Sequence, residues 1–213
     1  MPTNNTYKIQ TKGNDLHLRI AKGHFATGRS HMNYYIDITT QKSRLSEANA
    51  VAQDLMGHYN ASTIIDAILC LDGTEVIGTC LAQELTNAQF MNINAHRTIN
   101  VLTPEYTTNG QMIFRDNIAP ALKGKHVLIL AASVATGYTA NAAIEAIQYY
   151  GAEVVGIASI FASVKECSGY EVHSVFTTKD LPDYAIYPAQ ECPFCKQGVK
   201  IDALINNYGF SKI

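Results

Sequence analysis

The sequence predicts an α/β fold in which a parallel sheet is flanked by helices. Two strand–helix units in series support this prediction: an apolar strand at 64–71 precedes a helical pattern at 74–85, and a strand at 126–130 precedes a helix at 140–150. The chain has 213 residues, of which 47% are hydrophobic and 16% charged, enough for one sizeable core. This composition excludes a disordered chain, and the element order predicts a doubly wound sheet.

The N-terminal region is typical of two strands followed by a helix. Residues Leu16–Ile20 alternate between apolar and polar side chains, and Tyr34–Ile38 form a second strand-like run. From Ser43 to Tyr59 the apolar residues recur on one face of a helix, for which Ser43 or Ser46 is the expected N-cap. We therefore expect two paired strands that lead into an amphipathic helix.

The central region continues the alternation of strand and helix. The run Ile64–Leu71 is mostly apolar, which is typical of a strand buried on both faces in a parallel sheet. Thr74–Leu85 has helical spacing, and Ile99–Leu102 fits a further strand. Pro104–Ile118 shows no pattern and is expected to be a long loop, a kind of segment that is often functional.

A complete βαβ unit follows. His126–Leu130 is a buried strand, Ala131–Thr139 a turn of small residues, Ala140–Tyr150 a helix and Val154–Phe161 the next strand. Such a crossover is right-handed, so the two strands should be parallel. Ligands of these sheets bind beyond the carboxyl ends of the strands, which places the candidate site in the loops after the strands at 64–71 and 126–130.

The turn after Leu130 is the main candidate for binding a ligand. A turn of small residues that opens a helix presents backbone N–H groups and a partial positive charge, which suit a phosphate. Thr136 and Thr139 add hydroxyls, and Gly137 allows close approach of the backbone. The alternative is an ordinary βα turn with Thr139 as helix cap. The candidate phosphate-binding residues are Ala135, Thr136, Gly137, Tyr138 and Thr139. Gly-x-Gly-x-x-Gly is absent from the sequence, so a dinucleotide site is not supported.

These segments resemble a known family. The strand VLIL, the turn ending in Thr136-Gly137, the helix NAAIEAIQYYGA and the strand VVGIASI are similar to the phosphoribosyl-pyrophosphate (PRPP) motif of type I phosphoribosyltransferases. The segment from His24 to Ser30, with Tyr34–Asp37 after it, resembles the N-terminal hood of orotate phosphoribosyltransferases. The tail at 192–198 is similar to the C-terminal ends of some members, so the resemblance spans roughly residues 16–200.

The resemblance implies a type I phosphoribosyltransferase (Rossmann-like) parallel sheet with a small N-terminal hood. It implies a hood region at 1–42, a core at 43–190 and a tail at 191–213. It also implies a homodimer that binds PRPP and Mg²⁺ beneath the hood and converts orotate into orotidine monophosphate. The expected base-binding hood residues are Phe25, Thr27, Gly28 and Arg29.

The chain departs from the family pattern at charged positions. Ala131 and Ala132 stand where the family has two adjacent acids that hold the ribose hydroxyls, and Ala135 replaces a threonine. Losing two hydrogen bonds to charged groups costs on the order of 3–6 kcal/mol, or about 10²–10⁴-fold in binding. In the stretch corresponding to the mobile catalytic loop, Thr103–Asn117, the one cation is Arg115, a candidate anion contact.

The loop after the strand at 64–71 is the expected pyrophosphate or metal loop. It consists of Asp72, Gly73, Thr74 and Glu75, with two carboxylates where the family often carries lysine. Asp72 and Glu75 could replace the missing acids and hold Mg²⁺ or ribose hydroxyls. The alternative is that Asp72 begins a tight turn and Glu75 lies in the first turn of a helix, where acids are favoured.

Three functions remain open from the sequence. The first is phosphoribosyl transfer from PRPP to a pyrimidine base such as orotate. The second is a catalytically impaired protein that binds a nucleoside monophosphate on the same fold, and the third is a structural or assembly role. In each of the first two, the partner is a phosphorylated ribose or a nucleotide.

The cysteines suggest reduced thiols, because their number, five, is odd. Cys192-x-x-Cys195 has the spacing of a zinc site, but a structural site needs four ligands. Cys167 and His173 are the possible partners that precede the pair in the sequence; packing cysteines are the alternative, and the sequence assigns no metal. His24 and His31 belong to the hood segment and could donate hydrogen bonds to its ligand.

Charge and hydropathy narrow the classes of partner. Sixteen Lys and Arg against 18 Asp and Glu give a net charge of −2, which argues against nucleic-acid binding. No apolar run approaches the length of about 18 residues that a membrane span needs. Residues 1–13 lack the apolar segment of a signal peptide, so a cytoplasmic protein is expected. Asp202–Ile213 contains apolar residues suited to a docking helix or a dimer contact.

Overall fold

The computed structural model describes residues 6–10, 16–59, 61–87, 92–95 and 97–213. These residues form two compact units. Unit 1 comprises the described residues up to Thr40 together with Phe176–Ile213, and unit 2 comprises those in Gln41–Val175. Residues 176–190, expected in the core, therefore group with the hood, because a strand within them pairs with a hood strand.

Unit 2 has a sheet of six strands with the order β10-β11-β9-β8-β4-β5. The strands are β4 (Ala67–Cys70), β5 (Asn100–Leu102), β8 (His126–Val134), β9 (Glu153–Ala162), β10 (Glu166–Cys167) and β11 (Tyr170–Thr177). The helices are α2 (Leu45–Met56), α3 (Glu75–Thr86) and α4 (Tyr138–Tyr149), and a 3₁₀ turn lies at Ala119–Ala121. The residues of α1 (Thr39–Ser43) are divided between the two units after Thr40. A separate hairpin pairs β6 (Glu105–Tyr106) with β7 (Met112–Ile113).

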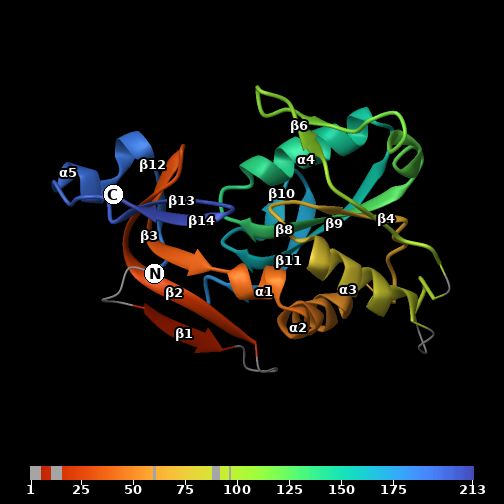
Figure 1. Cartoon of the computed structure of the whole chain (residues 1–213), viewed down its shortest axis with the longest axis horizontal. Coiled ribbons are helices and arrows are strands. Elements are labelled where there is room, and N and C mark those ends of the chain that lie inside the picture. The colour runs from red at the N-terminus through yellow and green to blue at the C-terminus, as the bar shows by residue number, and fades with distance from the viewer. Residues whose placement is uncertain (1–5, 11–15, 60, 88–91, 96) are drawn as a thin grey trace. The chain divides into compact units, whose positions relative to one another are not determined.

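The central strands confirm the parallel sheet. β4 pairs in parallel with β5 and β8, and β8 pairs in parallel with β9. The connection from β4 to β5 runs through α3 and moves one way across the sheet, whereas that from β8 to β9 runs through α4 and moves the other way. Because such crossovers are right-handed, α3 and α4 lie on opposite faces, as Figure 1 shows. The direction in which successive strands are added to the sheet therefore reverses between β4 and β8.

The core of unit 2 follows the predicted burial. All four residues of β4 are buried, as expected for a strand covered on both faces. α2 buries Ala48, Val51, Ala52 and Leu55, four members of the apolar stripe that the sequence predicts. Of the other two members, Met56 is half-buried, and Leu45 at the start of the helix is 64% exposed. The N-cap of α2 is Arg44, so the prediction of Ser43 or Ser46 is wrong.

Two sequence predictions in unit 2 need correction. β8 does not end at Leu130 but continues to Val134, because its pairing with β9 extends to Ala162. Ala131–Val134 are therefore strand residues and not part of the turn. The segment expected as a long loop at 104–118 contains the β6–β7 hairpin, which is anchored where the Phe114 backbone N–H donates to the Tyr150 hydroxyl at 3.0 Å.

Unit 1 is a second six-stranded sheet with the order β12-β3-β2-β13-β14, to which β1 adds by pairing with β2. Its strands are β1 (Thr6–Gln10), β2 (His17–Ala26), β3 (Ser30–Asp37), β12 (Ile186–Pro188), β13 (Ala203–Asn206) and β14 (Gly209–Lys212). A 3₁₀ turn at Ala189–Glu191 precedes the short helix α5 (Pro193–Lys196). The expectation of a docking helix in the tail is wrong, since the tail forms the β13–β14 hairpin.

Within the part of the chain that the structure describes, no helix has the length and apolarity needed to cross a membrane.

Candidate functional site

Two loops of unit 2 lie at the same edge of its sheet. β4 and β8 are parallel neighbours, so the loops that follow them leave from the same edge. The Leu71 backbone N–H donates to the Leu130 carbonyl at 2.8 Å just beyond β4. The direction of the crossovers switches between these two strands, and such switch points are where open α/β sheets bind ligands.

The turn between β8 and α4 depends on Gly137. This residue is the N-cap of α4 and has a left-handed backbone with φ of 77°. A Cβ at this position would lie 2.9 Å from the Cys167 sulfur, so glycine is required both for its backbone conformation and for its packing. Since Gly137 is the N-cap and Thr139 lies inside α4, the alternative of Thr139 as helix cap is wrong.

The same turn is fixed on its other side by the end of β9. The Ser163 hydroxyl donates to the Ala135 carbonyl at 2.7 Å, and the Ser163 backbone N–H donates to Val134 at 3.0 Å. Thr136 and Thr139 are exposed. A helix leaves the N–H groups of its first turn without acceptors inside the helix and adds a partial positive charge. A pre-formed turn with these groups and two exposed hydroxyls is suited to a phosphate.

The positions beside this turn lack charge. Ala131 and Ala132 lie in β8 and are 2% and 3% exposed. Ala131 pairs with Ser159 of β9. The strand thus continues as apolar, paired backbone at the place where the resembled family carries two acids.

The loop after β4 is a tight turn. Asp72 and Gly73 both have positive φ, 58° and 79°, and the Thr74 backbone N–H donates back to the Leu71 carbonyl at 3.3 Å. These φ signs are those of a type I′ turn, in which aspartate and glycine are the favoured residues. The Thr74 hydroxyl donates to the carbonyls of Leu71 and Leu130 at 2.9 and 3.0 Å, so this fully buried side chain joins the loop to both strands.

Of the four predicted pyrophosphate or metal residues, Thr74 is therefore structural. Glu75 is exposed and is the first residue of α3, as the alternative interpretation expected. Asp72 and Glu75 still offer carboxylates at this edge of the sheet, and carboxylates together with substrate phosphates are what Mg²⁺ takes as ligands. The residues present thus fit a magnesium ion that arrives with a phosphorylated ligand.

Lys42 is a site residue that the sequence did not reveal. Its ammonium group donates to the Asp72 carbonyl at 2.8 Å, and an ideal Cβ on Gly73 would lie 3.6 Å from the Lys42 nitrogen. The same Cβ would lie 4.0 Å from a carboxylate oxygen of Glu75. A cation is therefore present beside the loop where the sequence suggested only carboxylates. Lys42 precedes Asp72 by 30 residues, and no local pattern links the two.

Arg115, the candidate anion contact, already has a carboxylate partner. Its guanidinium donates to Glu105 across the β6–β7 hairpin, and this hydrogen bond and charge raise the pKa of Arg115. Both side chains are mostly exposed. An anionic ligand would have to compete with Glu105 for this cation.

The hood residues divide into buried and exposed. Phe25 is fully buried in unit 1, with its ring centroid 6.0 Å from that of Tyr35, so stacking of a base on Phe25 does not fit the structure. The Thr27 hydroxyl holds the β2–β3 turn by accepting the backbone N–H groups of Arg29 and Ser30 at 3.2 and 2.9 Å. Gly28 and Arg29 are the exposed residues of this predicted group.

All five cysteines are free thiols, as expected. Burial raises the pKa of Cys70 to about 12, which makes it inert at neutral pH. The suggested partners of the Cys192-x-x-Cys195 pair make their contacts elsewhere: Cys167 packs against Gly137, and the His173 ring stacks on His58 with centroids 4.2 Å apart. The pair instead lies against His24.

Comparison with known proteins supports the resemblance seen in the sequence. No protein-family model matches the chain. A curated orotate phosphoribosyltransferase of Chlorobium phaeobacteroides is 26% identical over 192 residues, which cover 86% of this chain and 88% of that protein. The orotate phosphoribosyltransferase of Chlorobaculum parvum is 25% identical over 184 residues, with 85% and 86% covered.

Solved structures show the same fold. Orotate phosphoribosyltransferase of Mycobacterium tuberculosis in complex with inorganic phosphate has a TM-score of 0.51 and 20% identity, covering 70% of this chain and 81% of that one. Its complex with PRPP has a TM-score of 0.50 and 20% identity, covering 69% and 82%. The chain therefore has the type I phosphoribosyltransferase fold, and its sequence is similar to orotate phosphoribosyltransferases.

Proposed function

We propose that this chain binds the 5′-phosphate of PRPP at residues 135–139 and transfers the phosphoribosyl group to a pyrimidine base such as orotate. The observation that most supports it is the turn at Gly137, a left-handed glycine that opens α4 between two exposed threonines. Similarity to orotate phosphoribosyltransferases over 85–86% of the chain supports the choice of reaction.

In this proposal a base nitrogen attacks the anomeric carbon, and the bond from that carbon to the pyrophosphate oxygen breaks. The hydroxyls of Thr136 and Thr139 and the first turn of α4 hold the 5′-phosphate in place. Lys42 offers a positive charge near the leaving pyrophosphate, where charge stabilisation has its largest effect. Mg²⁺, when bound, neutralises charge on the pyrophosphate, and Asp72 and Glu75 are the residues that would hold it.

The second candidate is binding of a nucleoside monophosphate without transfer. It is favoured by the buried Ala131 and Ala132, which cannot contact ribose hydroxyls as two acids would. A nucleoside monophosphate needs the phosphate turn but no pyrophosphate site.

Calorimetric titration with PRPP, with and without Mg²⁺, followed by an assay of orotidine monophosphate formation, separates the candidates. Binding that Mg²⁺ strengthens, together with turnover, supports transfer. Binding of a nucleoside monophosphate without PRPP turnover supports the second candidate. The variant Thr136→Val should weaken either ligand about tenfold, while Thr86→Val at the far end of α3 serves as control. No binding of any phosphate ester would overturn both candidates and favour a structural role.

The proposal includes a homodimer, as the resemblance implies. Light scattering on the purified chain tests it, with twice the 23.3 kDa chain mass as the expected result. A monomer at micromolar concentration would contradict this part of the proposal. The cytoplasmic location expected from the sequence stays a prediction.

A further inference from the structure

Four side chains of unit 1 bring potential metal ligands together. They are His24 of β2, His31 of β3, Cys192 just before α5 and Cys195 within α5, and their ligand atoms all lie within 4.8 Å of one another. His24 Nε2 is 3.0 Å from His31 Nδ1. The Cys192 sulfur is 3.5 Å from His24 Nε2, and the Cys195 sulfur is 3.7 Å from His24 Nε2 and 3.3 Å from His31 Nδ1.

These distances match a tetrahedral zinc site. Zinc bonds of about 2.3 Å to sulfur and 2.05 Å to nitrogen, at tetrahedral angles, separate two nitrogens by about 3.3 Å and nitrogen from sulfur by about 3.6 Å. The observed separations of 3.0 Å and 3.3–3.7 Å are close to both values. We propose that His24, His31, Cys192 and Cys195 bind one zinc ion.

The orientation of His24 supports a metal at its Nε2 atom. On the other side of the ring, Nδ1 faces the carbonyls of Val199 and Lys200 at 3.0 and 3.2 Å. Carbonyls accept hydrogen bonds only, so Nδ1 carries the proton and Nε2 presents its lone pair toward the cysteines. Metal-ligating histidines commonly donate their second ring nitrogen to a carbonyl in this way.

The backbone around His24 departs from regular strand pairing. The pairing of β2 with β3 shifts register between Lys22 and Phe25, and a bulge of this kind redirects a side chain. The His24 backbone N–H donates to a carboxylate oxygen of Asp202 at 2.7 Å. A Cβ on Gly23 would lie 2.5 Å from that same oxygen, so the glycine makes room for Asp202.

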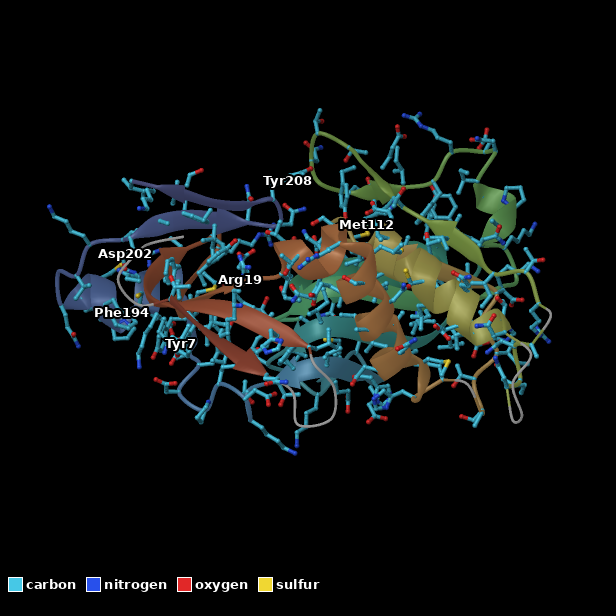
Figure 2. All side chains as sticks on the ribbon, turned by 60° about the horizontal axis from the view of Figure 1, so that its bottom comes forward. Tyr7, Arg19, Met112, Phe194, Asp202 and Tyr208 are labelled. Atoms are coloured by element: carbon cyan, nitrogen blue, oxygen red, sulfur yellow. The ribbon has the colours of Figure 1, made fainter. Side chains whose placement is uncertain are left out.

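The cluster is largely closed to water. His24 is 1% exposed, Cys192 fully buried and His31 9% exposed. The Phe194 ring stacks on His24 with centroids 5.2 Å apart, and Figure 2 shows Phe194 and Asp202 at the same end of unit 1. A proton can bridge two of these four ligand atoms at a time, whereas one cation satisfies all of them. Because four protein ligands complete the tetrahedron, the ion is structural, and it links α5 to β2 and β3.

The metal content of the untagged, full-length protein tests this inference. Elemental analysis after gel filtration should find about one zinc per chain. Cys195→Ser changes an exposed residue and should weaken zinc binding at least about 100-fold, because losing a ligand costs more than losing its hydrogen-bond partner. Cys80→Ala, a cysteine of α3 outside the cluster, should keep the full zinc content. Unchanged zinc in Cys195→Ser would overturn the proposal.

Cobalt substitution gives a readout that needs no variant. The metal-free, reduced protein refilled with Co²⁺ should show the strong visible bands of tetrahedral cobalt together with thiolate-to-cobalt charge transfer. The weak spectrum of octahedral cobalt would contradict the proposal. So would a Cys192–Cys195 disulfide whose reduction leaves a protein that takes up neither Zn²⁺ nor Co²⁺. The inference does not depend on the proposed function, since the four ligands share no residue with the phosphate turn.

Discussion

The two units of this chain are organised by contacts of very different sequence separation. In unit 2, β4 is joined to β5 through α3, and β8 to β9 through α4, so each strand is followed by the helix that covers it. In unit 1, β2 pairs with β13 and β3 with β12, which joins the beginning of the chain to its end. Local patterns therefore specify unit 2, while unit 1 depends on particular long-range contacts.

The long-range contacts of unit 1 combine a small apolar cluster, in which Ala203 and Phe210 pack with Phe25 and Tyr35, with a set of polar contacts around Asp183. Asp183 accepts hydrogen bonds from Lys22 and from the Tyr34 hydroxyl, and its backbone carbonyl accepts one from Asn33. The buried Asn33 also accepts the backbone N–H of Ala185 at 2.8 Å. Together with the cluster at His24, these contacts position the C-terminal segment on the sheet. Breaking them should affect unit 1 and leave the strands of unit 2 protected.

Removing the metal should produce the largest difference in amide hydrogen exchange between the two units. If zinc links α5 to β2 and β3, its binding free energy also stabilises the fold of unit 1, since an unfolded chain has no assembled site. Chelation should therefore speed amide hydrogen exchange in β12 and β13 by about 100-fold or more, with little change in β8 and β9. Hydrogen exchange resolved by peptide, with and without chelator, measures this. Equal acceleration in both units would contradict the comparison.

Gly137→Ala should have the second largest effect, a loss of stability that originates in unit 2. A left-handed alanine costs about 1–2 kcal/mol, and its contact with Cys167 adds about 1–3 kcal/mol. Gly124→Ala is a matched control, because its φ of 68° imposes the same backbone strain with nothing within 4 Å of the added Cβ. Chemical denaturation should therefore show a larger loss for Gly137→Ala, and only this variant should lose phosphate binding. Equal losses would mean that the Cys167 contact is unimportant.

The same contrast between local patterns and long-range pairing explains which elements of the fold could be predicted from the sequence. α3 and α4 were predictable because apolar residues recur in them at the helical period, and β4 because it lies in a mostly apolar run typical of a strand buried on both faces. The extension of β8 through Ala131–Val134 was not, because small residues carry no periodic signal and pairing with β9 decides their conformation. In the tail, apolar residues such as Leu204 and Ile205 fit a helix as well as a strand, and only pairing distinguishes the two.

For the candidate sites too, the sequence could identify residues that are close together in the chain but not those that long-range contacts bring together. The phosphate turn lies within one βα connection, so its residues could be identified together. Lys42 reaches Asp72 from another helix, and the interaction leaves no trace in the local sequence. The Cys192-x-x-Cys195 pair has zinc-like spacing, but with two ligands in sight the sequence assigned it no metal. The other two ligands of the proposed site, His24 and His31, lie at the far end of the chain and depend on the β2–β3 pairing.

Two buried asparagines, one in each unit, allow a matched comparison of how far along the chain the loss of a side chain's hydrogen bonds is felt. Asn33 in unit 1 bridges Asp183 and Ala185, while Asn94 in unit 2 bridges the backbone of Thr63 and Ile65 at 2.8 and 2.9 Å. Each alanine variant loses two hydrogen bonds of a buried side chain and should cost about 2 kcal/mol. Hydrogen exchange should locate the effect of Asn94→Ala near residues 63–65 and that of Asn33→Ala across β12. If Asn33→Ala left β12 protected, the polar contacts would not hold unit 1 together.

The smallest effect should come from a polar contact inside unit 2. Asp66 accepts the backbone N–H and the ring nitrogen of His126 at 3.0 and 2.9 Å at the start of β8. Burial by itself would raise the pKa of Asp66, but these hydrogen bonds and nearby positive charges lower it below 3.8 overall. The folded state therefore prefers the carboxylate, and the resulting stabilisation is complete above the unfolded pKa and lost as pH falls through the folded pKa.

Asp66→Asn should accordingly destabilise the protein by about 1 kcal/mol at pH 7, with the difference shrinking as the pH falls below 3.8. Denaturation midpoints of the variant and the parent across this range measure it, with the exposed Asp116→Asn as control. The effect is small because the apolar core that surrounds β4 and β8 remains intact in the variant. A loss as large as the roughly 2 kcal/mol expected for Asn94→Ala would contradict this prediction, because it would show that the apolar core does not limit the effect of removing the Asp66 carboxylate.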